Sequence, residues 1–238
     1  MIFIKPIIGV IGRIDVASDD DKVVCMWEST RRAIVKKHCI PFLILPNQDL
    51  EYGLLEPKDI PNLTEIEKED LKKIVDMCDG LLIPGGYKWY EFDEFIYNYA
   101  LEKNIPILGI CVGMQMMCRI DQNRNSVCED TTIKNNTKIN HNQRDKKYVH
   151  SVSIVDNTKL SKIINKNKIE VNSKHNYHVD RIVNLKISAY SFDGLIEAVE
   201  YENKKFVIGV QWHPETMLDY DDDANKIFDE FINKCKNN

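Results

Sequence analysis

Short apolar runs between glycine and proline residues most strongly constrain the fold of this chain. Four of them lack polar alternation: 7–11, 42–45, 81–83 and 105–110. A strand without polar alternation is buried on both faces, which is typical of a parallel sheet covered by helices. The sequence therefore predicts an α/β fold with a mostly parallel central sheet flanked by helices.

The clearest helix signal is the segment Thr64-Glu65-Ile66-Glu67, which has the Thr-x-x-Glu spacing of a capping box. Apolar residues then follow with helical periodicity and predict a helix over 65–78. Weaker periodicity predicts further helices over 27–38, 92–101 and 224–235. The helix at 27–38 lies between two apolar runs, so the N-terminal part is expected to form a strand–helix–strand unit.

The second half of the chain is expected to form a small antiparallel extension. Residues 121–148 are rich in Asn, Lys, Arg, Asp and Thr, and this composition predicts a solvated connection. Short β-rich stretches follow at 149–155, 187–190, 195–199 and 206–210. Their close spacing favours antiparallel or mixed pairing. No linker or internal repeat divides the chain, so residues 1–238 are interpreted as a single domain.

Composition argues against several classes of function. The 238 residues include 32 Lys and Arg against 37 Asp and Glu, and without a long basic block this disfavours nucleic acid as a partner. No apolar run approaches the roughly 20 residues of a membrane span, and the N-terminus lacks the pattern of a signal peptide. The seven cysteines are irregularly spaced without a CxxC pair, which disfavours disulfides and a structural zinc site. A cytoplasmic protein with reduced thiols and no membrane partner is expected.

Gly109-Ile110-Cys111-Val112-Gly113 has the Gly-x-nucleophile-x-Gly spacing of a sharp strand-to-helix turn. The backbone of a nucleophile in such a turn is strained, and its neighbours at −2 and +2 must lack side chains. The N-terminus of the following helix would stabilise a thiolate. The alternative is that Cys111 is one more buried cysteine and that the glycines only allow close packing.

Gln211-Trp212-His213-Pro214-Glu215 follows another predicted strand and supplies an imidazole and a carboxylate two residues apart. Because Pro214 stiffens the segment, Glu215 could accept a hydrogen bond from one ring nitrogen of His213 while the other faces a cysteine. This is the relation of nucleophile, base and orienting group in a catalytic triad. A single histidine beside a proline is also a common structural feature.

Pro84-Gly85-Gly86 ends a third predicted strand. Two glycines there leave backbone N–H groups free to face a ligand, and the N–H groups of Gly86 and Val112 could stabilise an oxyanion. Pro-Gly-Gly is equally an ordinary turn sequence.

In combination, these segments resemble a known family. GICVGMQ at 109–115, VNSKH at 171–175, DGLIEAVE at 193–200 and GVQWHPE at 209–215 closely resemble the class I glutamine amidotransferase superfamily. Within it the chain is most similar to the γ-glutamyl-γ-aminobutyrate hydrolase branch, peptidase family C26. The resemblance runs from about Pro6 to Phe231 and implies the flavodoxin-like fold of that superfamily.

The resemblance also implies a role for individual residues. Cys111 would be the nucleophile, His213 the general base and acid, and Glu215 the residue that orients His213. Gly86 and Val112 would provide the backbone donors of the oxyanion hole. Further residues are implied at the substrate pocket: Gly85, Gln115, Asn172, Ser173 and His175. The implied reaction is hydrolysis of a γ-glutamyl amide through a γ-glutamyl thioester, with release of glutamate and without a cofactor.

Two alternatives stay open at this stage. The chain could be a glutaminase subunit that supplies ammonia to a separate synthetase, or a non-catalytic binding protein on the same fold. Only Tyr87 to Glu91 separate Gly86 from the next predicted helix, whereas hydrolases of this branch usually have a long loop there. Val112 stands where the branch commonly has arginine. The leaving amine, the pathway and the oligomeric state, a homodimer included, are therefore left open.

Three other features have competing interpretations. His175 and His178 have the i, i+3 spacing of metal ligands on a helix, but no Asp, Glu or Cys partner has matching spacing, so no metal is expected. One hypothesis places Arg13 at the edge of the cleft, in contact with a carboxylate. The aromatic residues of 87–90 would either stack on a substrate or pack on the following helix. The acidic segment 219–223 is expected to favour the N-terminus of the last helix.

Overall fold

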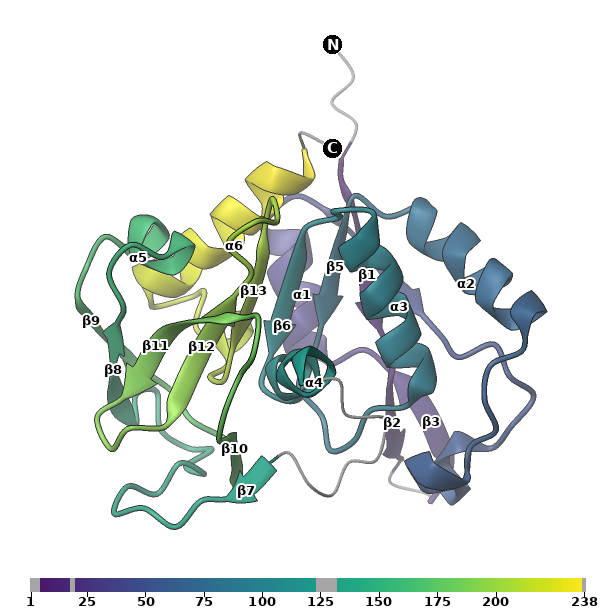
Figure 1. Cartoon of the computed structure of the whole chain (residues 1–238), viewed down its shortest axis with the longest axis horizontal. Helices are drawn as coiled ribbons and strands as arrows, with labels where there is room; N and C mark the ends of the chain where they lie inside the picture. The colour runs from purple at the N-terminus through teal and green to yellow at the C-terminus, as the bar shows by residue number, and fades with distance from the viewer. Residues whose placement is uncertain (1–4, 18–19, 123–131, 237–238) are drawn as a thin grey trace.

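The computed structural model describes residues 5–17, 20–122 and 132–236 of the chain (Figure 1). Nine strands form one mixed sheet in the order β4-β1-β5-β6-β13-β12-β11-β8-β9. The parallel half consists of β4 (Ile40–Ile44), β1 (Ile7–Ile11), β5 (Gly80–Ile83), β6 (Ile107–Ile110) and β13 (Val207–Val210). The antiparallel half consists of β12 (Ile196–Glu200), β11 (Lys186–Ser191), β8 (His150–Ile154) and β9 (Lys168–Val171). The predicted α/β fold is confirmed, and the predicted extension continues the central sheet.

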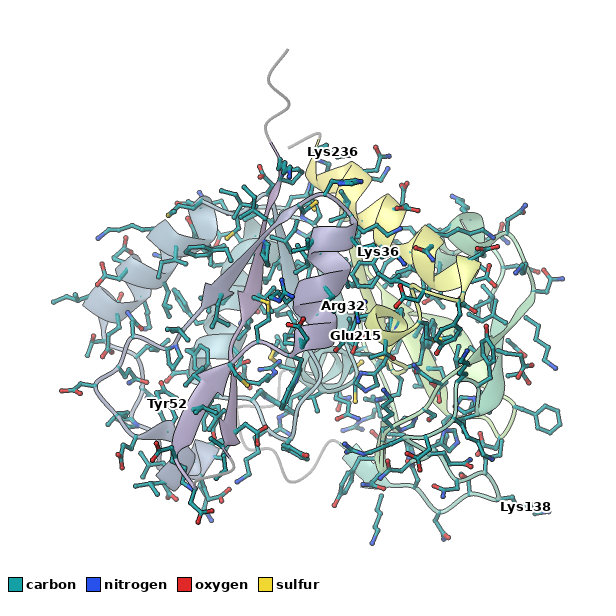
Figure 2. All side chains as sticks on the ribbon, turned by 180° about the vertical axis from the view of Figure 1, so that it is seen from behind. Arg32, Lys36, Tyr52, Lys138, Glu215 and Lys236 are labelled. Atoms are coloured by element: carbon teal, nitrogen blue, oxygen red, sulfur yellow. The ribbon has the colours of Figure 1, made fainter. Side chains whose placement is uncertain are left out.

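Helices cover both faces of this sheet (Figures 1 and 2). On one face lie α1 (Glu28–Lys36) and α6 (Asp222–Cys235), and on the other lie α3 (Glu91–Glu102) and α4 (Val112–Asp121). Helix α2 (Glu65–Asp76) packs on α3, and α5 (Lys159–Ile164) packs on α6. Single turns of 3-10 helix occur at η1 (Tyr52–Leu54), η2 (Pro57–Asp59) and η3 (Pro214–Thr216).

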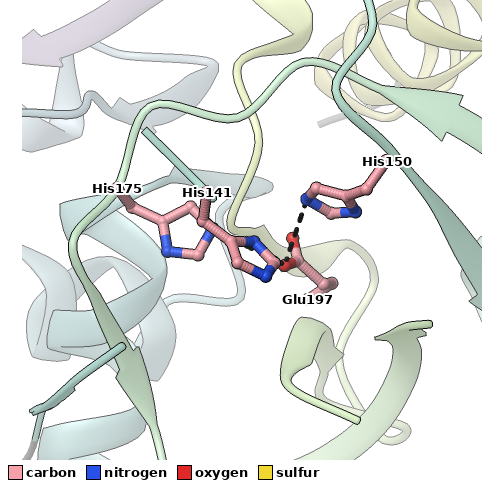
Figure 3. A group of neighbouring side chains, drawn as sticks. All are labelled: His141, His150, His175 and Glu197. Carbon is pink, nitrogen blue, oxygen red and sulfur yellow. Dashed lines mark ion pairs between the residues drawn. The ribbon is translucent and has the colours of Figure 1, made fainter. Parts of the chain in front are cut away.

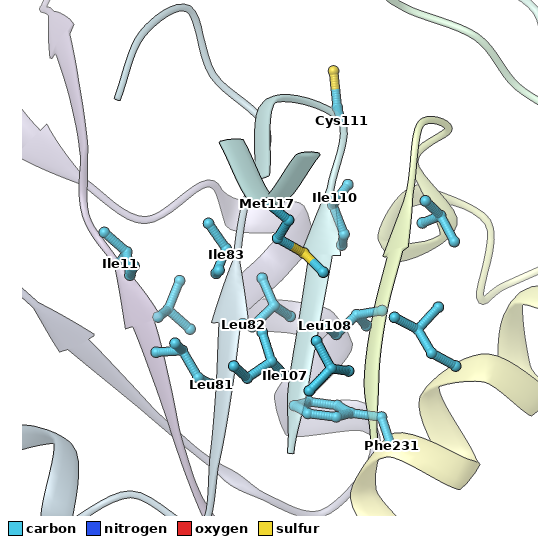
Figure 4. Close-up of a cluster of buried hydrophobic side chains, with 14 of the residues drawn as sticks. Ile11, Leu81, Leu82, Ile83, Ile107, Leu108, Ile110, Cys111, Met117 and Phe231 are labelled. Atoms are coloured by element: carbon cyan, nitrogen blue, oxygen red, sulfur yellow. The ribbon is translucent and has the colours of Figure 1, made fainter. Parts of the chain in front are cut away.

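The core lies around the central parallel strands, whose side chains are fully buried (Figure 4). Met117 of α4 and Phe231 of α6 belong to the same buried cluster, so the apolar runs are covered from both sides as expected. Cys111 stands at the end of β6, at the edge of this cluster (Figure 4). A rigid core therefore supports the segment that carries the thiol.

The helix-start signals are confirmed by the hydrogen bonds of the caps. Thr64 Oγ1 accepts from the backbone N–H of Glu67 at 3.3 Å, and the Glu67 carboxylate accepts from the N–H of Thr64 at 2.7 Å. In the acidic segment before α6, the Asp221 side chain accepts from the N–H of Ala224 at 2.7 Å. Local sequence thus determines where both helices begin.

Some boundaries and several short elements differ from the prediction. The predicted strand β4 begins at Ile40 rather than at Phe42 and includes Pro41, which is tolerated because β4 is an edge strand. Strands β2 (Arg13–Val16) and β3 (Lys22–Cys25) form a separate antiparallel pair. Strands β7 (Thr132–Lys134) and β10 (Tyr177–Val179) form another.

The prediction of a solvated connection over 121–148 is partly wrong. Helix α4 continues to Asp121, β7 pairs with β10, and His141 is only 1% exposed. Residues 123–131, with Cys128, lie outside the described residues. None of the helices in the described ranges is long and apolar enough to cross a membrane.

Candidate active site

Three neighbouring parallel strands bring the predicted motifs together. Strands β5, β6 and β13 are adjacent in the sheet, so their carboxyl ends meet at one edge. Gly85 follows β5, Cys111 follows β6, and His213 lies three residues after β13. The sheet topology therefore places the glycine turn, the thiol and the imidazole side by side.

The turn around Cys111 has the strained geometry that its sequence predicts. Cys111 has φ 53° and ψ −107°, a backbone conformation that residues with a Cβ rarely adopt. A Cβ on Gly113 would lie 2.2 Å from the carbonyl oxygen of Ile83, and one on Gly109 would lie 2.4 Å from Met117 Sδ. Gly113 therefore cannot carry a Cβ without a backbone shift, whereas a Cβ at Gly109 would displace the Met117 side chain. Cys111 is also the residue from which α4 starts, so its side chain lies at the positive end of that helix.

His213 links the thiol to a carboxylate. Its Nδ1 lies 2.8 Å from Oε1 of Glu215, and its side chain also makes a hydrogen bond with Cys111. Because a carboxylate only accepts, Nδ1 carries the proton in this contact and Nε2 is left for the thiol. Glu215 lies in η3, which packs against α1 near Arg32 (Figure 2). The side chains of His213 and Glu215 are only 14% and 5% exposed.

Burial and charge shift the pKa values of Cys111 and His213 in opposite directions. Burial raises the pKa of the Cys111 thiol, but the charge of His213 and the hydrogen bond with it outweigh burial and lower the pKa overall. For His213, burial lowers the pKa, while the charges of Glu215 and Cys111 raise it to about 10. His213 therefore favours the thiolate form of Cys111, and a thiolate beside a protonated imidazole is the reactive form of a nucleophilic cysteine.

The glycine turn after β5 packs directly on this pair. A Cβ on Gly85 would lie 2.8 Å from His213 Cε1 and 3.4 Å from Cys111 Cβ. The carbonyl oxygen of Gly85 accepts a hydrogen bond from Trp27 Nε1 at 2.9 Å, and that of Pro84 accepts from Arg13 Nη2 at 2.8 Å. Trp27 and Arg13 thus hold the turn from behind, a role that the sequence did not reveal.

The hypothesis that Arg13 reaches the edge of the cleft is wrong. Arg13 is 3% exposed and forms an ion pair with Asp93 of α3, which is fully buried. A Cβ on Gly86 would lie 2.8 Å from Arg13 Cδ, so the guanidinium side chain lies directly behind the glycine turn. The carboxylate that Arg13 contacts belongs to the protein itself.

A cleft of about 470 Å³ opens in front of the thiol. Among the residues predicted at the site, the following line it: Gly86, Cys111, Val112, Gln115 and His175. Gln115 Nε2 donates to the carbonyl oxygen of Tyr177 and to Gln211 Oε1, both at 3.1 Å, which fixes its amide. Tyr87, which is 69% exposed, and the buried Trp89 also line the cleft.

The structure corrects the expectation for Asn172 and Ser173, which lie behind the wall of the cleft. Asn172 Oδ1 accepts from the backbone N–H of His213 at 2.8 Å, and its Nδ2 donates to the carbonyl oxygen of His213 at 3.0 Å. Ser173 is fully buried, and its Oγ lies 3.4 Å from His141 Nδ1. Asn172 therefore holds the backbone of the imidazole residue, while Ser173 contacts a cluster of histidines.

That cluster consists of His141, His150, His175 and Glu197, whose ligand atoms could hold a metal ion. The sequence offered no partner with matching spacing for His175, and the three residues beside it in the structure come from distant parts of the chain. His178 is not among them; its Nδ1 contacts Asn135 Oδ1 at 3.0 Å. The spacing of neighbouring residues in the sequence could not reveal this group.

Comparisons with known proteins identify relatives of this chain. A sequence model of the family Peptidase C26 matches residues 88–215. A glutamine amidotransferase-like protein of Rickettsia prowazekii is 33% identical over 223 residues, covering 67% of this chain and 78% of that protein. A CTP synthase of Hydrogenobaculum sp. is 29% identical over 211 residues, covering 77% of this chain and 39% of the synthase. The chain thus spans about two fifths of that relative.

Solved structures with this fold include the glutaminase domain of a Trypanosoma brucei CTP synthase with bound acivicin. It has a TM-score of 0.62 at 19% identity, covering 97% of this chain and 94% of that one. A protein described as a GMP synthase subunit from Thermoplasma acidophilum has a TM-score of 0.64 at 18% identity, covering 98% and 95%. At these identities the likeness concerns the fold, whereas the family match concerns the sequence. The chain belongs to the Peptidase C26 family of glutamine amidotransferase-type hydrolases, which act on amide bonds.

Proposed function

We propose that this protein is a cysteine-dependent hydrolase of γ-glutamyl amide bonds that acts through a γ-glutamyl thioester. The observation that carries the proposal is the chain of contacts from Cys111 in its strained turn, through His213, to Glu215 at 2.8 Å. A buried thiolate beside an imidazolium at the mouth of a cleft is equipped for nucleophilic attack on a carbonyl carbon. The family match supports amide bonds as the target.

In the first half of the reaction, the Cys111 thiolate attacks the γ-carbonyl carbon and the carbonyl oxygen becomes an oxyanion. Val112 is the first residue of α4, so its backbone N–H has no partner within the helix, and Gly86 lines the same cleft. These two N–H groups are the proposed donors to the oxyanion. The imidazolium of His213 then gives its Nε2 proton to the amine, the C–N bond breaks, and a thioester with Cys111 is left.

In the second half, the neutral imidazole of His213 takes a proton from water as the water attacks the thioester. Collapse of this second tetrahedral intermediate breaks the C–S bond, releases glutamate and restores the thiolate and imidazolium. Glu215 accepts the Nδ1–H of His213 throughout and holds the imidazole in the tautomer that both steps need. The rim of the cleft carries basic residues that complement the α-carboxylate of a glutamyl group: Lys58, Arg144 and Lys174.

A second candidate function is that of a glutaminase which supplies ammonia to a separate synthetase. The observation that favours it is the match of 77% of this chain to a CTP synthase. The two candidates share the Cys111 chemistry and differ in the leaving group, which is a larger amine in the first case and ammonia in the second.

The test is glutamate release by the purified chain from glutamine and from a panel of γ-glutamyl amines. The proposal predicts turnover of at least one γ-glutamyl amine far faster than glutamine, and none by the Cys111→Ala variant. Slow turnover of glutamine alone would favour the second candidate. Unchanged turnover by Cys111→Ala would reject both, and Cys118→Ala is the matched control, since that thiol is equally buried but lies in helix α4.

A further inference from the structure

Four buried side chains from separate segments converge on one point beside the cleft (Figure 3). His141 comes from the connection between β7 and β8, His150 from β8, His175 from the loop between β9 and β10, and Glu197 from β12. Each contributes one ligand atom, and these four atoms all lie within 4.8 Å of one another. The four side chains are at most 2% exposed.

The contacts around this cluster favour one tautomer of each histidine. One ring nitrogen of each faces an oxygen that can only accept: His141 Nε2 faces Asp193 Oδ2 at 3.0 Å, His150 Nδ1 faces the carbonyl oxygen of Ser151 at 3.3 Å, and His175 Nδ1 faces that of Tyr177 at 2.9 Å. These contacts favour a proton on each outer nitrogen, and at His175 Nδ1 the shorter contact to Tyr177 outweighs that to Asn135 Nδ2 at 3.4 Å. In the neutral imidazoles, the inner nitrogens carry lone pairs.

The inner nitrogens all face the carboxylate of Glu197. Its Oε1 lies 3.5 Å from His141 Nδ1, 3.7 Å from His150 Nε2 and 3.5 Å from His175 Nε2 (Figure 3). Within the described residues, four buried atoms have no partner at an ordinary hydrogen-bond distance: both carboxylate oxygens of Glu197 and the inner nitrogens of His150 and His175. Buried acceptors that face one another without a donor are costly, and a cation among them removes that cost.

The dimensions and chemistry of the cluster fit zinc. Tetrahedral zinc with ligand bonds of about 2.0–2.1 Å holds its ligand atoms about 3.3 Å apart. The separations of 3.5–3.7 Å around Glu197 Oε1 are close to that value. Imidazole ligands whose outer N–H groups bond to carboxylate or carbonyl oxygens are also the usual arrangement at zinc. We propose that His141, His150, His175 and Glu197 form a closed structural zinc site with three nitrogen ligands and one oxygen ligand.

A metal here would tie the cleft to the antiparallel half of the sheet. His175 lines the cleft that also contains Cys111, whereas His150 and Glu197 belong to β8 and β12. His141 lies in the connection between β7 and β8, next to Asn142, which forms an isolated β-bridge with Lys174. Zinc would therefore fix one wall of the cleft to this connection, and its binding energy would add to the stability of the fold.

The experiment measures zinc bound per chain after dialysis against buffered zinc, together with the absorption spectrum of the cobalt-substituted protein. It uses the Cys111→Ala background, because the Cys111 thiolate beside His213 could itself bind zinc. The expected result is one zinc ion per chain, an increase in Tm on loading, and a cobalt spectrum of a tetrahedral site without thiolate bands. Glu197→Gln and His141→Asn should lose the metal, whereas the matched control His178→Asn should keep it.

Several results would overturn the proposal. Failure of the parent protein to bind zinc would mean that a proton occupies the point among the four side chains. Retention of one zinc ion by a folded Glu197→Gln variant would place the metal elsewhere, with folding checked by circular dichroism. If Glu197→Gln does not fold, the cobalt spectrum of the parent decides, because thiolate bands or an octahedral spectrum would exclude this set of ligands.

Discussion

The strain at Cys111 leads to a prediction that compares glycine and alanine at two buried cysteines. Cys111 has φ 53° and ψ −107°, which for a residue with a Cβ stores about 1–3 kcal/mol. Cys118 lies in helix α4 and is buried to a similar extent, at 0% exposure against 5% for Cys111. Alanine removes the sulfur at either site, and glycine also removes the Cβ. The difference between the alanine and glycine variants therefore isolates the effect of the Cβ on the free energy of unfolding.

At Cys118 the change from alanine to glycine should lower the free energy of unfolding by about 1 kcal/mol through lower helix propensity. Loss of the buried Cβ should lower it by about 0.8 kcal/mol more. At Cys111 similar losses are offset by release of the strain, so the glycine variant should lie within about 1 kcal/mol of the alanine variant. The difference between the two steps equals the strain itself, about 1–3 kcal/mol. Urea unfolding of the four variants measures it. An equal cost at both sites would refute the claim that the turn holding the thiol is strained.

Four further predictions concern the groups around the thiol. The rate should fall above about pH 10, where His213 loses the proton that it gives to the leaving amine. Glu215→Gln should move this fall to lower pH, because the Glu215 charge raises the pKa of His213. A profile of kcat/KM against pH measures both effects, and a fall at unchanged pH in Glu215→Gln would contradict the contact between His213 and Glu215. Gly85→Ala should lower kcat by about 10²-fold with little loss of stability, because its Cβ displaces His213. Asn172→Ala should lower kcat and leave KM nearly unchanged, since the Asn172 amide holds the His213 backbone. A change in KM alone would indicate that Asn172 contacts the substrate. Arg13→Met should cost about 3–5 kcal/mol in urea unfolding because it leaves a buried carboxylate unpaired, and a cost below about 1 kcal/mol would contradict this.

The parallel half of the sheet was predictable because its strands carry almost no polar residues. The runs 81–83 and 105–110 are apolar throughout, and burial on both faces is the only arrangement that removes such strands from water. Strand β9 was missed because Lys168 and Glu170 alternate with apolar residues, a pattern that reflects its single buried face. Strands β2 and β3 were missed because they are four residues long and mostly only partly buried.

The candidate site was predictable where its residues follow consecutive parallel strands. Strands β5, β6 and β13 are parallel neighbours, so their carboxyl ends bring Cys111 and His213 together, although the sequence favoured antiparallel or mixed pairing for 206–210. The histidine cluster was not predictable in this way, because His141 lies in a polar segment and Glu197 lies 56 positions further along the chain. For the motif at 171–175, the direction of each side chain depends on tertiary packing. His175 lines the cleft, whereas Asn172 points to the His213 backbone.

The most direct test of the proposed function is to trap the covalent intermediate. Wild-type protein is mixed with a γ-glutamyl amine that it turns over, quenched in acid within one turnover, digested and examined by mass spectrometry. We expect a glutamyl adduct on the peptide that carries Cys111, absent from the Cys111→Ala variant and retained in Cys118→Ala. Turnover without any adduct on Cys111, or an adduct on another residue that decays at the rate of turnover, would contradict it.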